Sequence, residues 1–343
     1  MSDAGKPPLQ ASIEEHPITT QEYAVYTPPM DSIIETIGNW IDQRVTGGYI
    51  YGPSRFGKSR TVKWYVRAEL EARFHGKLPL VVWLRQDTQI MGEAEFWNML
   101  LLAAKYEFID PLKPKKKSIA RFLFFEHLRT LACSSGCNYV VLIIDEAQRV
   151  STNELTWLMG VQNKLDDVGI RLTTVQVGSH QLGYVPDYLS RTGYAHVTAR
   201  FFAQDAAFHG LRSIEELKFV LGGYDVDSEW PSKSKISFLQ FFAPDAFNEG
   251  RRLSDHAALL WEAFSQLRPP ELKKGKMTRI PFELPMMHVA HTVESILKEL
   301  AKSKDWDAAL KRKNLLNTIA KTKFTDFLRR LLPPRLDIHD KSL

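Results

Sequence analysis

The sequence predicts an α/β fold with a parallel sheet core, followed by a helical region. Three observations predict it. Apolar stretches of strand length alternate with amphipathic helical stretches through about the first 210 residues, and YVVLIIDEA is the most strand-like of them. The segment GGYIYG runs directly into a glycine-containing loop. After residue 210 the strand pattern gives way to helical periodicity. Continuous apolar strands separated by helices are typical of a parallel sheet covered on both faces.

The composition is typical of a soluble globular protein of 343 residues, with 44% hydrophobic and 25% charged residues. No apolar run reaches the roughly 18 residues of a membrane span, so no membrane partner is expected. The N-terminus has no basic start followed by an apolar stretch, which leaves the bacterial cytoplasm as the expected location. The two cysteines, Cys133 and Cys137, lack a second pair or a histidine cluster, so they are interpreted as reduced thiols.

Residues 1–25 are polar and contain prolines, and we expect them to form a flexible N-terminal arm. A helix is expected from Pro28 onward, because Ile33, Ile34, Ile37 and Trp40 fall on one helical face. The α/β core is expected over residues 26–210. Its strands are predicted at 47–52, 78–85, 138–147 and 170–179, and its helices at 58–74, 92–107, 118–134 and 152–167.

Two helical parts are expected to follow this core. Residues 211–268 predict a small helical lid, and residues 269–343 predict a basic helical C-terminal extension. A proline- and lysine-rich stretch, 266–285, has the composition of a linker. Residues 271–343 hold 16 lysines and arginines against nine aspartates and glutamates. This excess favours an anionic partner, although a solvated surface would carry the same charges.

The segment GPSRFGKS, residues 52–59, fits the phosphate-loop pattern G-x-x-x-x-G-K-[ST] between a strand and a helix. Its glycines allow backbone N–H groups to turn toward phosphate oxygens, and the following helix presents its positive end. Lys58 is suited to neutralise the β- and γ-phosphates, and Ser59 offers a hydroxyl to Mg²⁺. ATP and Mg²⁺ are therefore the expected cofactors. The predicted nucleotide-binding residues of the loop are Gly52, Pro53, Ser54, Arg55, Phe56, Gly57, Lys58, Ser59 and Arg60.

A second motif, IIDEAQ, ends the most apolar strand with Asp145 and Glu146. Ligands of parallel sheets bind at the carboxyl ends of the strands, which is where these carboxylates are expected. Asp145 is predicted to hold Mg²⁺, directly or through water, and Glu146 to polarise the attacking water. A solvated acidic turn would show the same local sequence, and the phosphate loop favours the functional interpretation.

With both motifs present, the chain resembles an AAA+ ATPase. The resemblance implies a polar residue after the fourth strand that contacts the γ-phosphate or the lytic water. Ser179 fits best and Gln176 second, with an ordinary helix-capping serine as the alternative for Ser179. It also implies an arginine that acts across a subunit boundary and stabilises the transition state of phosphoryl transfer. Arg191 and Arg200 are the candidates, with Arg191 slightly favoured.

The same resemblance implies contacts to the nucleotide from outside the α/β core. An arginine at the start of a lid helix folds back on the nucleotide in this class, and Arg251 or Arg252 matches that position. Either one also fits a solvated arginine in a first helical turn. The segment YTPP resembles the strap beside the adenine, so Tyr26 to Pro28 are expected to line the base.

Within this class, the loop GPSRFGKSRTV and the motif IIDEAQ are similar to those of the TnsC/TniB group, ATP-dependent regulators of DNA transposition. The similarity covers about residues 25–265, and the long basic tail resembles TnsC-type proteins, including those of CRISPR-associated transposons. It implies ATP-dependent assembly on duplex DNA as a hexameric or heptameric ring or a helical filament. It also implies a transposase and a TniQ- or TnsD-like target-selection protein as partners, and disassembly on hydrolysis.

The segment DPLKPKKKSIARF, between the two phosphate motifs, is a candidate for DNA contact. It holds Lys113, Lys115, Lys116, Lys117 and Arg121. Lysines suit sequence-independent contacts to phosphate, and no aromatic residue interrupts the lysine run for base stacking. A solvated loop is the alternative. Two other functions remain open: a replication-initiator or helicase-loader ATPase, and a signalling NTPase scaffold that acts without DNA.

Overall fold

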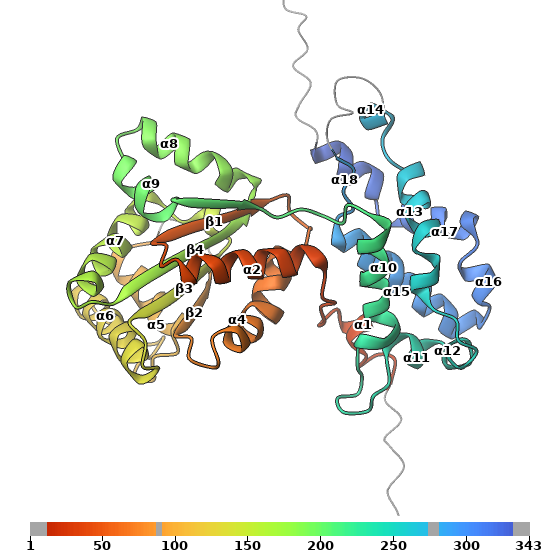
Figure 1. Cartoon of the computed structure of the whole chain (residues 1–343), viewed down its shortest axis with the longest axis horizontal. Helices are drawn as coiled ribbons and strands as arrows, with labels where there is room; N and C mark the ends of the chain where they lie inside the picture. Colours follow the sequence, from red (N-terminus) through yellow and green to blue (C-terminus); the bar gives the residue numbers. More distant parts are fainter. Residues whose placement is uncertain (1–11, 87–90, 274–280, 332–343) are drawn as a thin grey trace, which may run out of the picture. The chain divides into compact units, whose positions relative to one another are not determined.

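The computed structural model describes residues 12–86, 91–273 and 281–331. The chain forms two compact units (Figure 1). Residues Pro29–His209 form an α/β unit. The chain from Gly210 onward forms a helical unit together with the N-terminal residues up to Pro28.

The strands of the α/β unit form one five-stranded sheet in the order β2-β3-β4-β1-β5, and every described pair is parallel. The strands are β1 (Gly47–Gly52), β2 (Leu80–Leu84), β3 (Tyr139–Asp145), β4 (Arg171–Ser179) and β5 (Gln204–Ala207). This order places β1 between the last two strands of the sequence. The loop after β1 therefore leaves the carboxyl edge near the centre of the sheet, where ligands of such sheets bind.

Helices cover both faces of this sheet (Figure 1). On one face, alternate residues of β3 (Val140, Leu142 and Ile144) share a core with the helices α5 (Glu93–Ala103), α6 (Lys117–Ser134), α7 (Thr152–Asp167) and α9 (Ala195–Phe201). The other face is covered by α2 (Pro28–Asp42) and α4 (Arg67–Arg73). β3 is buried along its whole length, which explains its continuous apolar sequence.

The structure confirms the predicted α/β fold and the parallel sheet. The predicted helix over residues 58–74 is present, although its middle is a π-helical segment, Thr61–Val66, between α3 (Lys58–Arg60) and α4. The predicted helix over residues 92–107 ends earlier, at Ala103. β5 was not located from the sequence, because its four residues are largely exposed and lack an apolar pattern. The apolar pair Phe201 and Phe202 lies at the end of α9 and not in a strand.

The helical unit begins with α1 (Pro17–Thr20) and continues after the sheet. Its next helices are α10 (Ile214–Gly222), α11 (Phe238–Phe242), α12 (Pro244–Asn248), α13 (Ala257–Gln266) and α14 (Pro270–Lys273). The last ones are α15 (Met286–Ser303), α16 (Trp306–Ala309), α17 (Arg312–Lys321) and α18 (Phe324–Leu331). They share one hydrophobic core, so the segments expected as a lid and an extension are packed together.

Two further expectations change in this unit. Residues 16–25 do not form the flexible arm, because His16, Ile18, Tyr23 and Val25 are buried in the helical core. Residues 1–11 of the expected arm lie outside the described residues. The expected linker 266–285 is also partly structured: Leu284 is buried and exchanges backbone hydrogen bonds with Leu211. Residues 274–280 of that stretch lie outside the described residues.

Candidate functional site

The phosphate loop leaves the carboxyl end of β1 in a conformation that requires its glycines. A Cβ atom on Gly52 would lie 2.4 Å from the carbonyl oxygen of Phe208, the residue after β5, so this position has no room for a side chain. Gly57 has a φ angle of 119°, in the region that favours glycine. Gly57 is followed directly by α3. The loop therefore brings its backbone to a helix N-terminus at the carboxyl edge of the sheet, as phosphate binding requires.

Lys58 is turned back onto this loop. Its Nζ donates hydrogen bonds to the carbonyl oxygens of Gly52 at 2.9 Å and Pro53 at 2.7 Å, and the residue is only 8% exposed. Burial lowers the pKa of Lys58 to about 8, although the carboxylates of Asp145 and Glu146 oppose this shift. A buried ammonium with only carbonyl hydrogen-bond acceptors favours an anion in the loop, and phosphate oxygens would supply that charge.

Asp145 ends β3 and is 4% exposed. Burial raises the pKa of its carboxyl group, and hydrogen bonds from the Ser59 hydroxyl and the Glu146 N–H oppose the rise. The second of these bonds is 2.9 Å long. The structure thus places the Ser59 hydroxyl beside the Asp145 carboxyl group, although the two residues are 86 positions apart in the sequence. An oxygen pair of this kind suits Mg²⁺, which binds carboxylates together with substrate phosphates.

Glu146 follows Asp145 with a left-handed backbone, φ 58° and ψ 35°. A residue other than glycine rarely adopts this conformation, and such strain is concentrated at functional sites. The Glu146 carboxylate accepts a hydrogen bond of 2.8 Å from Gln148 Nε2 and lies 3.7 Å from the Arg149 guanidinium. Glu146 also lies close enough to Lys58 for its negative charge to raise the pKa of that lysine. The predicted base therefore lies beside the phosphate loop with a fixed orientation.

The two candidates on β4 have different positions. Ser179 ends β4 opposite Gly52 of β1 in the sheet register, so it reaches the same edge as the phosphate loop. Its hydroxyl accepts a hydrogen bond from the N–H of Gln181 and caps the 3-10 turn His180–Tyr184. Gln176 is fully buried and donates to the carbonyl oxygen of Phe201. The geometry favours Ser179 over Gln176, and the capping role expected as the alternative is also present.

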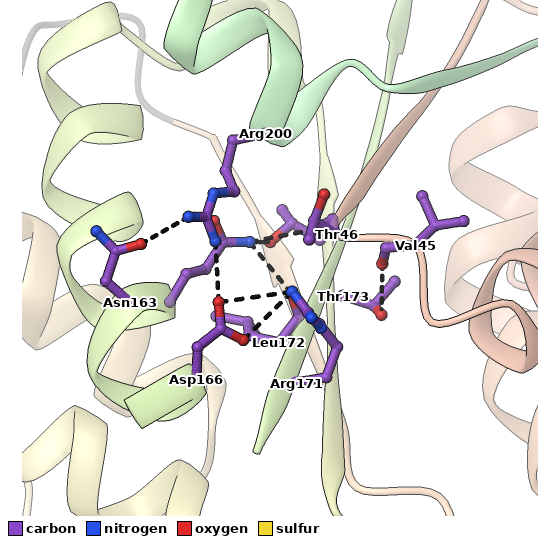
Figure 2. Close-up of polar contacts among 10 residues, drawn as sticks. Val45, Thr46, Asn163, Asp166, Arg171, Leu172, Thr173 and Arg200 are labelled. Carbon is purple, nitrogen blue, oxygen red and sulfur yellow. Dashed lines mark hydrogen bonds and ion pairs between the residues drawn. The ribbon is translucent and has the colours of Figure 1, made fainter. Parts of the chain in front are cut away.

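The two candidate arginines are also separated by the structure. Arg200 of α9 is held within its own unit, and Figure 2 shows its guanidinium directed at α7. It donates to Asp166 at 3.0 Å and to Asn163 at 2.8 Å, and Arg171 shares the same aspartate at 3.3 Å. Arg191 ends α8 (Val185–Arg191) and is exposed. An arginine that acts on a neighbouring subunit must be accessible, so Arg191 fits that role better than Arg200.

The lysine segment precedes and begins α6. Lys113, Lys116 and Lys117 are exposed, while Lys115 is half-buried and its backbone is bound to the side chain of Asn98. Lys117 and Arg121 lie 3.7 and 3.6 Å from the carboxylate of Glu93. The segment is therefore anchored to α5 and presents most of its positive charge to solvent.

The remaining predicted residues belong to the helical unit. Arg251 pairs with Glu249 at 3.0 Å and Asp307 at 3.3 Å. The Arg252 guanidinium donates to the carbonyl oxygens of Phe247 and Arg251, and lies over the ring of Phe247. The expected contacts of Arg251 and Arg252 with a nucleotide stay a prediction. The same holds for the expected contacts of Tyr26 and Pro28. Among the described residues, no group of three or more histidine, cysteine, aspartate or glutamate side chains is arranged to hold a metal.

The fold of the chain matches that of solved structures. The chain superposes on the structure of the Aeropyrum pernix ORC2 protein, in ADPNP and ADP complexes, with a TM-score of 0.60. The match has 13% sequence identity and covers 90% of this chain and 72% of that one. The chain has the AAA+ fold. A structure of Drosophila ORC bound to DNA matches with a TM-score of 0.49 and 16% identity, over 88% of this chain and 68% of that one.

No protein-family model and no curated protein matches the sequence. The AAA+ fold therefore rests on the structure, and the finer assignment to the TnsC/TniB group is a proposal. No helix in the described part of the chain is both long and apolar enough to cross a membrane. Sequence reasoning missed Gln148, Arg149 and Gly178 as parts of the site. Gln148 follows directly in the motif IIDEAQ, which is the signal that could have found it.

Proposed function

We propose that this AAA+ protein binds ATP with Mg²⁺ and hydrolyses it. The main support for this proposal is that five residues lie together at the carboxyl edge of the sheet: Lys58, Ser59, Asp145, Glu146 and Ser179. Lys58 and the loop N–H groups would hold the phosphates. Ser59 and Asp145 would hold Mg²⁺, which would bridge phosphate oxygens and offset their charge.

In this proposal Glu146 orients a water molecule and accepts its proton as the water oxygen attacks the γ-phosphorus. The bond to the β–γ bridging oxygen breaks, and ADP and phosphate leave. Ser179 contacts the γ-phosphate or the attacking water. Glu146→Gln keeps the size of the side chain but removes the base, so the variant should bind ATP and lose turnover. Equal turnover in the variant and the wild type would contradict the assignment of Glu146.

Arg191 is proposed to complete the site of a neighbouring subunit. Its exposure at the end of α8 supports this role, whereas Arg200 is already bound to Asp166 and Asn163. Mixing Arg191→Ala with Glu146→Gln subunits tests it, because each variant lacks a different half of a shared site. Recovery of ATP turnover in the mixture supports action across the boundary. Absence of recovery, with both variants assembled, would contradict it. Arg200→Ala mixed in the same way serves as the matched control.

We further propose that the ATP-bound form assembles on duplex DNA and serves DNA transposition in the manner of TnsC-type proteins. The exposed lysine segment at α6 and the resemblance of the phosphate motifs support this proposal. Replacing Lys115, Lys116 and Lys117 by alanine should weaken DNA binding and reduce the salt slope by up to about three units. The matched control replaces three exposed lysines elsewhere in the α/β unit, Lys77, Lys105 and Lys164. Equal loss in both triple variants would contradict a specific role for this segment.

The transposase and a TniQ- or TnsD-like target-selection protein are the proposed partners, and the basic helices at the C-terminus are the proposed docking surface. Deleting residues 286–343 would not test this, because α15, α17 and α18 contribute to the core of the helical unit. Lys311→Ala with Lys313→Ala removes exposed charge without removing that core. The double variant should retain ATP turnover and lose transposase recruitment in a pull-down. Unchanged recruitment would rule out this part of the surface.

A replication-initiator function is the second candidate, and the fold similarity to the Aeropyrum pernix ORC2 protein favours it. A recognisable DNA-reading module at the C-terminus, such as a winged helix, is expected of that class. The described residues 281–331 form helices α15 to α18 and contribute a single bridge at Leu284 to β structure. Electron microscopy with a non-hydrolysable ATP analogue and duplexes of different sequence separates the candidates. Filaments on any duplex favour the transposition regulator, and complexes on particular sequences favour the initiator.

A further inference from the structure

The side chain of Gln148 connects two parts of the site that belong to different strands. Its Nε2 donates a hydrogen bond of 2.8 Å to the Glu146 carboxylate. Its Oε1 accepts a hydrogen bond of 2.9 Å from the backbone N–H of Ser179. Gln148 lies in the 3-10 turn after β3, and Ser179 ends β4. One amide group therefore joins the proposed base to the strand end that carries the proposed γ-phosphate contact.

The chemistry of the two neighbours fixes the orientation of this amide. The Ser179 N–H can only donate, so the amide oxygen must face it. An ionised Glu146 carboxylate can only accept, so the amide nitrogen must face it. Of the side chains of this length, only glutamine has both a donor and an acceptor in the required places. Glutamate would keep the acceptor for Ser179 but would put a second anion against Glu146.

The backbone beside this amide leaves space for it. A Cβ atom on Gly178 would lie 2.5 Å from Gln148 Oε1 and 3.3 Å from the Gln148 N atom. Any side chain at position 178 would therefore displace the amide from Ser179. Gly178 has no positive φ angle among the backbone angles of this chain, so the need for glycine here is spatial.

We propose that Gln148 is a positioning residue for ATP hydrolysis, which rests on the proposed function. It holds the Glu146 carboxylate at a fixed place relative to the end of β4, so that the base and Ser179 address the same γ-phosphate. Arg149 is the second partner of this carboxylate, 3.7 Å away, and it also donates to the carbonyl oxygen of Gln86. Because that contact is longer, at 3.7 Å against 2.8 Å, and its two side chains are about one third exposed, the Gln148 amide makes the larger contribution to the position of Glu146.

The experiment compares turnover and binding in the full-length chain. Gln148→Met removes both hydrogen bonds at similar length, and Gly178→Ala displaces the amide while leaving Gln148 intact. Gln181→Met is the matched control, because Gln181 is an exposed glutamine close to the same strand end. For each protein, kcat is measured with ATP and Kd with a non-hydrolysable ATP analogue. Thermal melting confirms that each variant is folded.

Gln148→Met and Gly178→Ala should each lower kcat by about 10- to 100-fold, the range for losing a hydrogen bond to a charged group. The Kd for the analogue should stay within about two-fold, because the phosphate loop is untouched. Gln148→Glu should lower kcat at least as much, and Gln181→Met should match the wild type. In a Glu146→Gln background, Gln148→Met should cause no further loss, since the group it positions is absent.

Several results would overturn this role. They are an unchanged or raised kcat in both Gln148→Met and Gly178→Ala, a parallel loss of analogue binding, or an undiminished effect of Gln148→Met in the Glu146→Gln background. Failure of the proposed function has a different signature. In that case the wild-type chain would show no ATP turnover that Glu146→Gln removes, and both proposals would be wrong. Turnover that depends on Glu146 but not on Gln148 would overturn only the positioning role.

Discussion

Lys58 offers the sharpest test of the phosphate loop, because its ionisation should control nucleotide affinity. Burial lowers the pKa of this lysine from 10.5 to about 8. At about 1.36 kcal/mol per pKa unit, keeping Lys58 charged costs the empty protein about 3 kcal/mol. This cost is fully present below pH 8 and disappears as the pH rises toward 10.5, where Lys58 is neutral in both the folded and the unfolded chain. Bound phosphate would offset it by supplying negative charge.

The affinity for a non-hydrolysable Mg²⁺–ATP analogue should therefore fall as the pH rises. Below pH 8 the ammonium is already present, whereas above pH 8 binding must first protonate the amine. Between about pH 7 and pH 9 the affinity should fall about ten-fold, provided that the bound lysine has a pKa well above 9. Binding should also take up close to one proton at about pH 9 and close to none at about pH 7.

Isothermal titration calorimetry in pairs of buffers with different ionisation enthalpies measures both quantities. Lys58→Met should bind weakly and lose the pH dependence. Lys63→Met, which changes an exposed lysine of the following helical segment, should retain it. An affinity that changes by less than about two-fold across this range, or no proton uptake at about pH 9, would show that Lys58 does not titrate as its burial implies.

Three further predictions concern the folded structure. Gly52→Ala places a Cβ atom 2.4 Å from the Phe208 carbonyl oxygen, so it should destabilise the protein by about 1–3 kcal/mol in urea denaturation. Gly160→Ala is the control: a Cβ atom at this position of α7 has no neighbour within 4 Å, so the change should be neutral or stabilising. Equal effects of the two changes would contradict the close approach at Gly52. The Arg85–Glu154 ion pair is fully buried, with 3.2 Å between its charged groups, so Glu154→Gln should lower the free energy of unfolding by about 3 kcal/mol or more. In the exposed Arg67–Glu71 pair, Glu71→Gln should lower it by less than about 1 kcal/mol. Similar losses in both pairs would contradict this assignment of burial. His16 is fully buried against Trp230, Phe238, Phe241 and Phe242, and burial lowers its pKa to about 4. As the pH falls, the His16 imidazole takes up a proton at a higher pH in the unfolded chain than in the folded protein. The free energy of unfolding of the wild type should therefore fall by about 2 kcal/mol more between about pH 7 and pH 5 than that of His16→Asn. Parallel pH profiles of the two proteins would show that His16 is accessible to protons in the folded state.

Local sequence patterns by themselves determined two parts of this protein, the buried strand β3 and the phosphate loop. The continuous apolar stretch of β3 predicts a strand that is buried on both faces, and the carboxylates at its end follow from the same stretch. The loop GPSRFGKS predicts its own turn, because its glycines and lysine, Gly52, Gly57 and Lys58, lie within one short segment of the chain. These features depend on neighbours only a few residues apart, so their physical causes are visible in the sequence.

Only the tertiary structure decided which distant groups meet. The sequence predicts that Ser59 and Asp145 both hold Mg²⁺, but the link from Glu146 through Gln148 to Ser179 depends on the register of β3 against β4. The register of β4 against β1 places Ser179 opposite Gly52 at the carboxyl edge of the sheet, while Gln176 is buried within β4.

Packing also decided the roles of residues whose local sequences look alike. Arg191 and Arg200 both lie in the last turn of a short helix, yet of the two only Arg200 faces acceptors on α7. His16 and Ile18 belong to a polar, proline-containing segment, but the aromatic side chains of α11 provide a core that buries them. Burial of this kind depends on surfaces formed more than 200 residues away in the sequence, and composition along the chain carries no record of them.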